Sequence, residues 1–309
     1  MYPKIYEGQE NMKYILLFLI TINILNANEI IRCEDYKKIS NYTVGKSPPS
    51  NMMLQTIREY KFPKKISKKD DAFKKLSGIE SLLEKKVDLV VLYNSSGNYA
   101  NLASKLQKVN IDSCSINLTS IYDYIDGYRT LGRIMNKEDR ANELSEYIEK
   151  KLKYVKSIEE SIPLEKRVTV YYAKRSNGLE SDCKDSVHSE VIELVGGINP
   201  VECNELKNTH VNINLEKLLM LNPDVIITSS KDFYKKIFKE SKYRYLKAVK
   251  EKRVYLVPKK PINWIDNPPS FLKILGALWL GQALYPQYYQ YDLKTQKKEF
   301  SKLFLKQGK

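Results

Sequence analysis

The sequence is poor in histidine and lacks the motifs of common catalytic and metal sites. Only 2 of its 309 residues are histidine, and its 4 cysteines do not combine with them at the spacing of zinc ligands. No G-x-S-x-G, G-x-x-x-x-G-K-[ST] or H-E-x-x-H motif occurs. These absences argue against an enzyme. They also argue against a bare metal ion held entirely by protein side chains.

The sequence also lacks a nucleic-acid-binding motif, although its net charge is +15. Such a charge can serve nucleic-acid or membrane binding when it is concentrated on one surface. Here the lysines are scattered along helical segments and are not grouped with aromatic residues. We therefore expect no nucleic-acid partner. A hydrophobic content of 42% allows a sizeable core, and the length allows about two domains.

Beyond residue 27 no apolar stretch reaches 18 residues, the length of a membrane span. Near the start, Met12-Lys13 are followed by the apolar run YILLFLITINIL and by Asn26-Ala27-Asn28. A basic start, a short apolar core and a small residue at the exit are typical of a secretory signal peptide. We predict this peptide at about residues 12–27 and export to the periplasm. A membrane anchor is the alternative.

Export makes disulfide bonds possible. Cys183 and Cys203 flank one helix-and-turn segment and are therefore the natural pair. Closing their loop of about 20 residues would stabilise the fold by roughly 3 kcal/mol in the chain-entropy description. Four free cysteines are the alternative.

Two segments of the chain repeat each other: IESLLEKKVDLVVLYNSS (79–96) and LEKLLMLNPDVIITSS (215–230). In each, a glutamate opens a short helical run (Glu80 and Glu216), and an aspartate follows eight positions later. An apolar β-branched run and a Ser-Ser pair complete both copies. The repetition predicts two similar lobes.

The pattern of the remaining segments is typical of an α/β protein. Residues 87–116 read as strand, helix and strand, which predicts a βαβ unit. Residues 120–161 keep one apolar side at helical spacing, with breaks expected near Gly132 or Asn136. A second set of strands and helices follows from Arg167 onward.

We therefore predict an α/β fold in which two Rossmann-like lobes are joined by a long connecting helix. The expected divisions are a signal peptide with an upstream extension (1–27), an N-terminal α/β lobe (28–119), a connecting helical spine (120–161) and a C-terminal α/β lobe (162–309). Such an arrangement leaves a cleft between the lobes, where ligands commonly bind.

Four segments resemble the helical-spine class (class III) of periplasmic substrate-binding proteins. They are YYAKRSNGLESDCKDSVHSEVIELVGGINPVEC (171–203), NINLEKLLMLNPDVIITSS (212–230), RVYLVP (253–258) and WIDNPPSFLKILGALWLGQALYP (264–286). Members of this class serve ABC importers of iron chelates, cobalamin, nickel complexes and molybdate. The resemblance covers about residues 42–290. Relatives carry some 20–30 further residues before the helix of Glu80, so we expect the first lobe to be trimmed.

The resemblance implies roles for the repeated glutamates. Glu80 and Glu216 match the surface residue by which each lobe docks on arginines of the ABC permease in the inner membrane. A carboxylate in the first turn of a helix is favoured by the helix dipole. The alternative is that both are ordinary acids at helix starts.

Candidate ligand contacts lie mostly in the C-terminal half. Tyr172 and Arg175 follow a strand, where α/β folds place ligands, and an arginine can bind an anionic group at two points. One of the two residues Tyr171 and Tyr172 is expected to face the cleft. His188, at a helix start, could ligate a metal directly, or could merely cap that helix. His210, in a polar loop, is a weaker candidate.

Further candidates lie on loops. Trp264 and Asp266 follow a strand in a proline-restrained loop that suits an organic chelator, with packing of the tryptophan at the hinge as the alternative. Ser47 and Tyr93 are the expected contacts of the first lobe.

Together these features predict a monomeric periplasmic binding protein with no intrinsic cofactor. It would capture a small anionic metal complex, an iron chelate such as a siderophore ahead of a nickel complex or molybdate. One alternative is a non-transporting remnant with an incomplete first lobe. The other is a two-lobed transferase, which would need a glycine-rich nucleotide-binding turn that the sequence lacks.

Overall fold

The computed structural model describes residues 31–41, 43–45, 48–58, 79–93, 99–203, 209–266 and 268–305. Its elements up to the longest helix are β1 (Thr43–Gly45), α2 (Pro48–Ile57), α4 (Ile79–Glu84), β2 (Leu89–Tyr93), α5 (Ala100–Gln107), β3 (Asp112–Ile116), α6 (Asp123–Ile134) and α7 (Glu138–Ser161). The later elements are η1 (Leu164–Lys166), β4 (Val170–Ala173), β5 (Glu180–Asp182), α8 (Glu190–Leu194), β6 (His210–Asn212), α9 (Leu215–Leu221), β7 (Val225–Thr228), α10 (Lys231–Lys236), η2 (Ser241–Tyr243), α11 (Lys247–Lys250), β8 (Val254–Leu256), α12 (Lys273–Leu284) and α13 (Leu293–Phe304). The expected signal peptide and the region of expected trimming lie outside the described residues.

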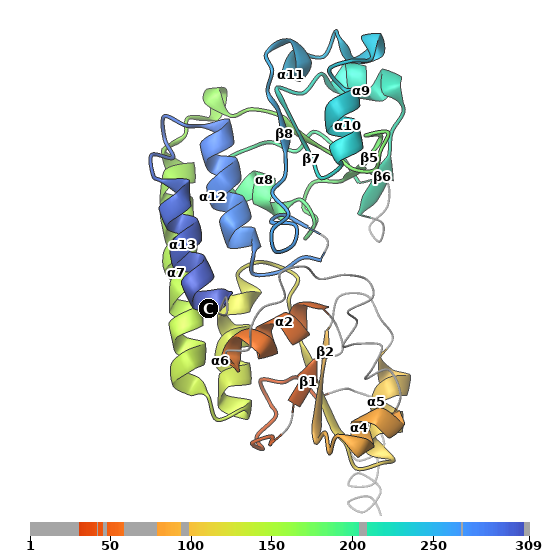
Figure 1. Cartoon of the computed structure of the whole chain (residues 1–309), viewed down its shortest axis with the longest axis vertical. Coiled ribbons are helices and arrows are strands. Elements are labelled where there is room, and N and C mark those ends of the chain that lie inside the picture. The colour runs from red at the N-terminus through yellow and green to blue at the C-terminus, as the bar shows by residue number, and fades with distance from the viewer. Residues whose placement is uncertain are drawn as a thin grey trace, which may run out of the picture.

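Two parallel three-stranded sheets lie at opposite ends of the molecule, with α7, α12 and α13 along one side (Figure 1). The first sheet has the order β1-β2-β3 and the second the order β4-β7-β8. The central strands, β2 and β7, are the apolar runs of the two repeated segments. The predicted α/β class is confirmed, and the repeat corresponds to the same position in both sheets.

The aspartate of each repeat holds the start of a neighbouring strand. Asp88, just before β2, accepts a hydrogen bond from the backbone N–H of Asn41 at 2.8 Å. Asp224, just before β7, accepts from the backbone N–H of Thr169 at 2.7 Å and from its hydroxyl at 2.8 Å. Because both carboxylates join adjacent parallel strands, the repeated sequence encodes a repeated structural contact.

The long helical region breaks between α6 and α7, as the sequence predicts. Asn136 has a left-handed backbone with φ of 52°, which asparagine tolerates better than most residues. At Gly132 an added Cβ would lie 2.3 Å from the Cβ of Ala141. Glycine therefore permits the close approach of α6 and α7 that follows the break.

A single cluster of buried apolar side chains connects the two sheets. It includes Leu89 and Val91 of the first sheet, Val170 and Ile227 of the second, and the inner faces of the helices between them. Moving one sheet relative to the other would expose part of this core to water, which is unfavourable in proportion to its apolar area. The shared core therefore opposes large hinge movements.

Polar contacts reinforce this connection. The carboxylate of Glu190 in α8 accepts from the backbone N–H of Ile121 at 2.9 Å and from the ammonium of Lys273 in α12 at 2.6 Å. Lys273 is 1% exposed. Because Ile121 lies just before α6, one buried ion pair joins the start of the helical region to two helices beside the second sheet.

The structure contains two disulfide bonds, Cys33–Cys114 and Cys183–Cys203. The second is the pair that the sequence suggests, whereas the first was not anticipated. Cys33 also donates its backbone N–H to the carbonyl of Ser115 at 2.8 Å. The segment before β1 is thus attached to β3 by both a covalent bond and a backbone hydrogen bond. Within the described residues no helix combines the length and apolarity of a membrane span.

The two disulfides should differ in their contributions to stability. The bond between Cys33 and Cys114 spans 81 residues and that between Cys183 and Cys203 spans 20. Chain entropy predicts losses of about 4–5 and about 3 kcal/mol when each pair is replaced by alanine. Urea unfolding of the two double variants measures both values. A larger loss for the shorter loop would contradict this account.

Candidate functional site

A polar cluster lies at the carboxyl edge of the second sheet, where the ends of its parallel strands meet. We call Lys174, Asp182, His188, His210 and Asp266 the polar cluster. Lys174 directly follows β4, and Asp266 lies in the loop after β8. The antiparallel pair β5–β6 places Asp182 opposite His210. The fold thereby gathers five polar side chains from segments that are distant in sequence.

The ammonium of Lys174 lies between two buried carboxylates. Its Nζ atom is 2.7 Å from Asp182 Oδ2 and 3.0 Å from Asp266 Oδ2. Both aspartate side chains are 0% exposed, and that of Lys174 is 6% exposed. The Nζ atom also lies 5.7 Å from the centre of the Tyr172 ring. Burial alone would lower the pKa of Lys174, but the charges and hydrogen bonds of the two aspartates raise it.

Asp266 is held in its ionised form. Burial alone would raise the pKa of its carboxyl, but the hydrogen bond and charge of His188 and the charge of Lys174 lower the pKa to about 2. An ionised carboxylate only accepts hydrogen bonds. Each side chain that hydrogen-bonds the carboxylate of Asp266 is therefore the donor of that hydrogen bond.

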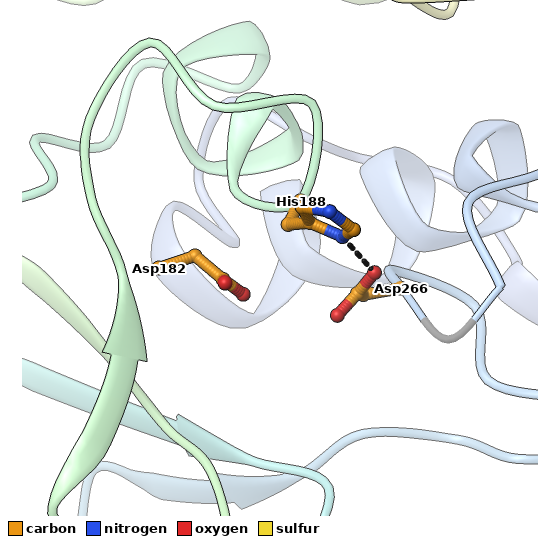
Figure 2. A group of neighbouring side chains, drawn as sticks. All are labelled: Asp182, His188 and Asp266. Atoms are coloured by element: carbon orange, nitrogen blue, oxygen red, sulfur yellow. Dashed lines mark hydrogen bonds and ion pairs between the residues drawn. The ribbon is translucent and has the colours of Figure 1, made fainter. Parts of the chain in front are cut away.

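The two histidines make equivalent contacts with the two aspartates. His188 Nδ1 lies 2.6 Å from Asp266 Oδ1, and His210 Nδ1 bonds Asp182 Oδ1. The centres of the two imidazole rings are 5.1 Å apart. Figure 2 shows the His188 ring directed at Asp266, with Asp182 on the other side of the group.

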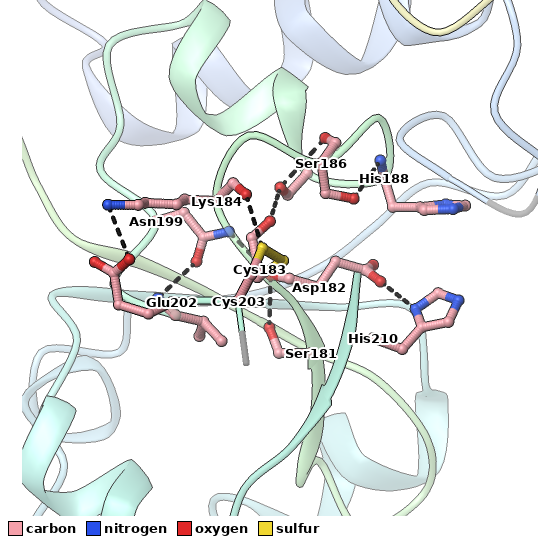
Figure 3. The surroundings of a disulfide bond; sticks show 12 residues. Ser181, Asp182, Cys183, Lys184, Ser186, His188, Asn199, Glu202, Cys203 and His210 are labelled. Atoms are coloured by element: carbon pink, nitrogen blue, oxygen red, sulfur yellow. Dashed lines mark hydrogen bonds and ion pairs between the residues drawn. A yellow bond between two sulfur atoms is a disulfide. The ribbon is translucent and has the colours of Figure 1, made fainter. Parts of the chain in front are cut away.

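His188 can bind a further group through its second ring nitrogen. Because its Nδ1 donates to Asp266, its Nε2 atom keeps a lone pair for a metal or a hydrogen-bond donor. The side chain is 23% exposed, and Nε2 has no hydrogen bond among the described residues. The backbone N–H of His188 donates to Ser186 Oγ at 3.1 Å, which anchors the residue before α8 (Figure 3).

The disulfide Cys183–Cys203 lies directly beside the cluster (Figure 3). Asp182 precedes Cys183, and the amide of Asn199 donates to the backbone carbonyl of Asp182 at 3.0 Å. Ser189 donates its hydroxyl to the carbonyl of Cys183 at 2.7 Å. The disulfide and these hydrogen bonds therefore fix the backbone that carries Asp182.

The expectation that Tyr171 or Tyr172 faces a cleft is wrong for the described structure. Both side chains are 0% exposed, because they point to the two covered faces of the second sheet. Tyr171 donates its hydroxyl to the carbonyl of Gly178 at 2.9 Å. The hydroxyl of Tyr172 accepts from the amide of Asn263 at 3.4 Å. The ring of Tyr172 packs beside the ammonium of Lys174.

Two other expected ligand contacts have partners within the protein. Arg175 has a left-handed backbone with φ of 60° and pairs with Glu180 at 3.0 Å, with its side chain 73% exposed. Trp264 is 4% exposed and donates its indole N–H to the carbonyl of Lys260 at 2.9 Å. Trp264 therefore packs within the protein, and Arg175 stays a predicted contact that lies outside the polar cluster.

Two ligand contacts were expected in the first lobe, Ser47 and Tyr93. Ser47 lies outside the described residues. Tyr93 ends β2, but its side chain also lies outside them. The roles of Ser47 and Tyr93 stay predictions.

The repeated glutamates occupy equivalent surface positions. Glu80 lies in the first turn of α4 and Glu216 in the first turn of α9, and both are exposed. The side chain of Asn214 caps α9 by accepting the backbone N–H of Lys217 at 2.8 Å. These positions agree with a docking role for the glutamates, which stays a prediction.

Residues 67–261 match the family described as periplasmic binding protein. The chain belongs to this family. A solute-binding protein of an ABC transporter from Sulfurospirillum deleyianum is 31% identical, with a TM-score of 0.77 over 91% of this chain and 95% of the other. The expected resemblance to class III binding proteins and the two-lobed fold are thereby confirmed.

Other relatives are more distant. The molybdate-binding protein MolA of Haemophilus influenzae is 26% identical over 234 residues, and the chain spans 65% of its length. The structure of MolA bound to molybdate has a TM-score of 0.67 at 20% identity. The vitamin B12-binding protein BtuF of Vibrio cholerae has a TM-score of 0.64 at 15% identity. The similarities to the structures of MolA and BtuF show that the chain shares their fold.

Replacing Asp266 by asparagine should change the acid stability of the fold. The pKa of Asp266 is about 2 in the folded chain and 3.8 in the reference state, so its carboxylate stabilises the fold above about pH 4. That contribution, about 2 kcal/mol, is lost as the pH falls from about 4 to about 2. The stability difference between wild type and Asp266→Asn should shrink over that range.

Urea unfolding at several pH values measures this difference. Asp126→Asn is the control, because Asp126 is 81% exposed and its pair with Arg129 contributes little. A difference between wild type and Asp266→Asn that does not vary with pH would contradict the assignment.

Proposed function

We propose that the chain is the substrate-binding component of an ABC importer and works in the periplasm. In this proposal it captures a metal complex or metal oxyanion between its two lobes and delivers it to the permease. The observation that carries the proposal is the polar cluster, which buries two carboxylates and one ammonium and offers the imidazole of His188. Family membership supports transport and not catalysis.

The charges of the cluster favour a metal complex over a free oxyanion. Asp182 and Asp266 carry two negative charges against the single positive charge of Lys174. These three buried groups sum to one negative charge behind His188, which attracts a metal cation and repels an oxyanion. An iron chelate is the first candidate and a nickel complex the second. Molybdate, which MolA binds according to its name, is the third.

The rigid connection of the two lobes suits this function. The shared apolar core and the Glu190–Lys273 ion pair hold the second sheet against the helical region. A fixed site does not lose much conformational freedom when it binds a ligand. We therefore expect the ligand to be bound with little domain movement.

The disulfides support a periplasmic location. Disulfides persist in oxidising compartments such as the periplasm and are rare in the cytosol. A folded first lobe is supported by the buried side chains of its sheet, among them Val90 and Leu92. This observation disfavours the remnant alternative.

Native mass spectrometry with metal analysis tests the proposal directly. Protein recovered from the periplasm should carry a bound metal complex. Thermal-shift and calorimetric titrations with iron-catecholate, nickel-histidine and molybdate should show binding of at least one. Metal-free protein that binds none of the three would contradict the proposed function.

Charge reversal of the repeated glutamates should separate docking from ligand binding. Both residues are exposed on helix starts outside the polar cluster, so Glu80→Arg and Glu216→Arg should leave ligand affinity unchanged. Uptake through the permease should fall at least about 10-fold, because an attractive ion pair becomes a repulsive contact.

Glu84→Arg is the matched control, because Glu84 is exposed at the other end of α4. Uptake assays in a reporter strain and calorimetry on the purified variants give the two measurements. Normal uptake by the Glu80→Arg, Glu216→Arg double variant would exclude the docking role.

A further inference from the structure

We infer that a groove between α7 and α13 binds an elongated dianion, a molecule with an anionic group at each end and an apolar middle. Figure 1 shows α7 and α13 on the side of the molecule away from β5 and β6. The groove therefore lies apart from the polar cluster. The inference goes beyond the proposed function and does not depend on it.

The groove has the size and lining of a small-molecule site. Its volume is about 520 Å³, within the range of about 300–1,000 Å³ that is usual for ligand pockets. Tyr147 and Leu303 contribute apolar surface to it. Its charged lining residues are Arg140, Glu143, Lys150, Lys151, Glu299 and Lys302. Because four cations face two carboxylates, the lining carries an excess of positive charge that favours an anion.

Two of these four cations are paired within the groove. Arg140 pairs with Glu143, and the ammonium of Lys151 lies 3.1 Å from the carboxylate of Glu299. The side chain of Lys151 is 13% exposed, and its Nζ atom also lies 5.2 Å from the centre of the Tyr147 ring. Cations that are already held in this way have little attraction left for a ligand. An anion is therefore expected to bind to the other two.

The other two cations lie toward opposite ends of the groove. Lys150 directly precedes Lys151, whereas Lys302 directly precedes Leu303, whose carbonyl accepts a hydrogen bond from Arg140. Residues 140 and 150 lie about 15 Å apart along α7, because a helix rises about 1.5 Å per residue. Both lysines are exposed, and neither has an ion pair within the described part of the chain. A ligand that contacts both lysines therefore needs two anionic groups that stand well apart.

The two glutamates disfavour a negative charge in the middle of the groove. Glu143 lies one helical turn before Tyr147, and Glu299 lies one turn before Leu303, so the carboxylates flank the apolar part of the lining. Like charges repel, most strongly where water is partly displaced. A molecule that is charged along its whole length is therefore disfavoured. Methylene groups in its middle could instead pack on Tyr147 and Leu303.

Two polar atoms of the lining residues also lack a partner. Tyr147 Oη and Arg140 Nε are buried and have no hydrogen bond among the described residues. Burial and then the charge of Glu299 raise the pKa of the Tyr147 hydroxyl, which therefore stays protonated and can donate. Buried donors without an acceptor are uncommon in folded proteins. A carboxylate in the groove can supply an acceptor once neighbouring side chains adjust.

The first test compares three probes on the wild-type protein by NMR titration. Decanedioate has a carboxylate at each end of an apolar chain, decanoate has only one, and butanedioate is too short to contact both lysines. Decanedioate should bind at least about 5-fold more tightly than either, because only decanedioate forms both charged contacts. Its chemical-shift changes should concentrate on α7 and α13. Equal binding of decanedioate and decanoate, or shifts confined to the second sheet, would overturn the inference.

The second test removes each ammonium in turn. Lys150→Gln and Lys302→Gln should each weaken decanedioate binding at least about 5-fold, to the level of decanoate. Lys298→Gln is the matched control, because Lys298 is exposed on α13 but does not line the groove. This control should leave the affinity unchanged. An equal loss in the control would mean that decanedioate responds only to the overall charge, and would overturn the inference.

The outcomes are distinguishable from those that test the proposed function. Specific binding of decanedioate by wild type supports the inference whether or not iron-catecholate, nickel-histidine or molybdate binds. No binding of decanedioate at millimolar concentration would overturn the inference and leave the proposed function intact. Melting temperatures of the lysine variants should equal that of wild type, which shows that any loss of binding is local to the groove.

Discussion

The site depends on one buried ammonium. Lys174 joins Asp182 at the end of β5 to Asp266 of the loop after β8. Without it two carboxylates would face each other in a region that excludes water, which is strongly unfavourable. Because each aspartate uses its other oxygen to hold a histidine, this ammonium also determines where both imidazoles lie. The geometry of the cluster therefore follows from the need to pair both buried carboxylates.

The rest of the fold makes that geometry rigid. The second sheet shares its apolar core with the helices that extend to the first sheet, and Glu190 connects α8 to both Lys273 and the start of α6. His188 lies two residues before α8, and its backbone N–H donates to Ser186 Oγ at 3.1 Å. The side chains of the site are therefore in position before a ligand binds. Binding then loses little free energy through ordering them.

Local patterns in the sequence predicted the parts of the fold that depend on neighbouring residues. The strands β2 and β7, the helix break at Asn136 and the exposed glutamates of the repeat all follow from such patterns. The antiparallel pairing of β5 with β6 did not, because these strands have three residues each and are separated by residues 183–209. That pairing places Asp182 beside His210. Lys174 was missed for a related reason: it is one of 52 basic residues, and only its partners distinguish it.

The structure also changes the ligand charge that the sequence led us to expect. From the sequence, Arg175 suggested an anionic ligand, but its guanidinium pairs with Glu180 on the surface, whereas the buried cluster carries excess negative charge. The positive charge that matters is Lys174, and it acts on the aspartates and not on the ligand. By pairing with both of them it makes their burial tolerable and stabilises the fold. The stability of this edge of the second sheet therefore depends on one lysine, because its loss would leave two buried carboxylates facing each other.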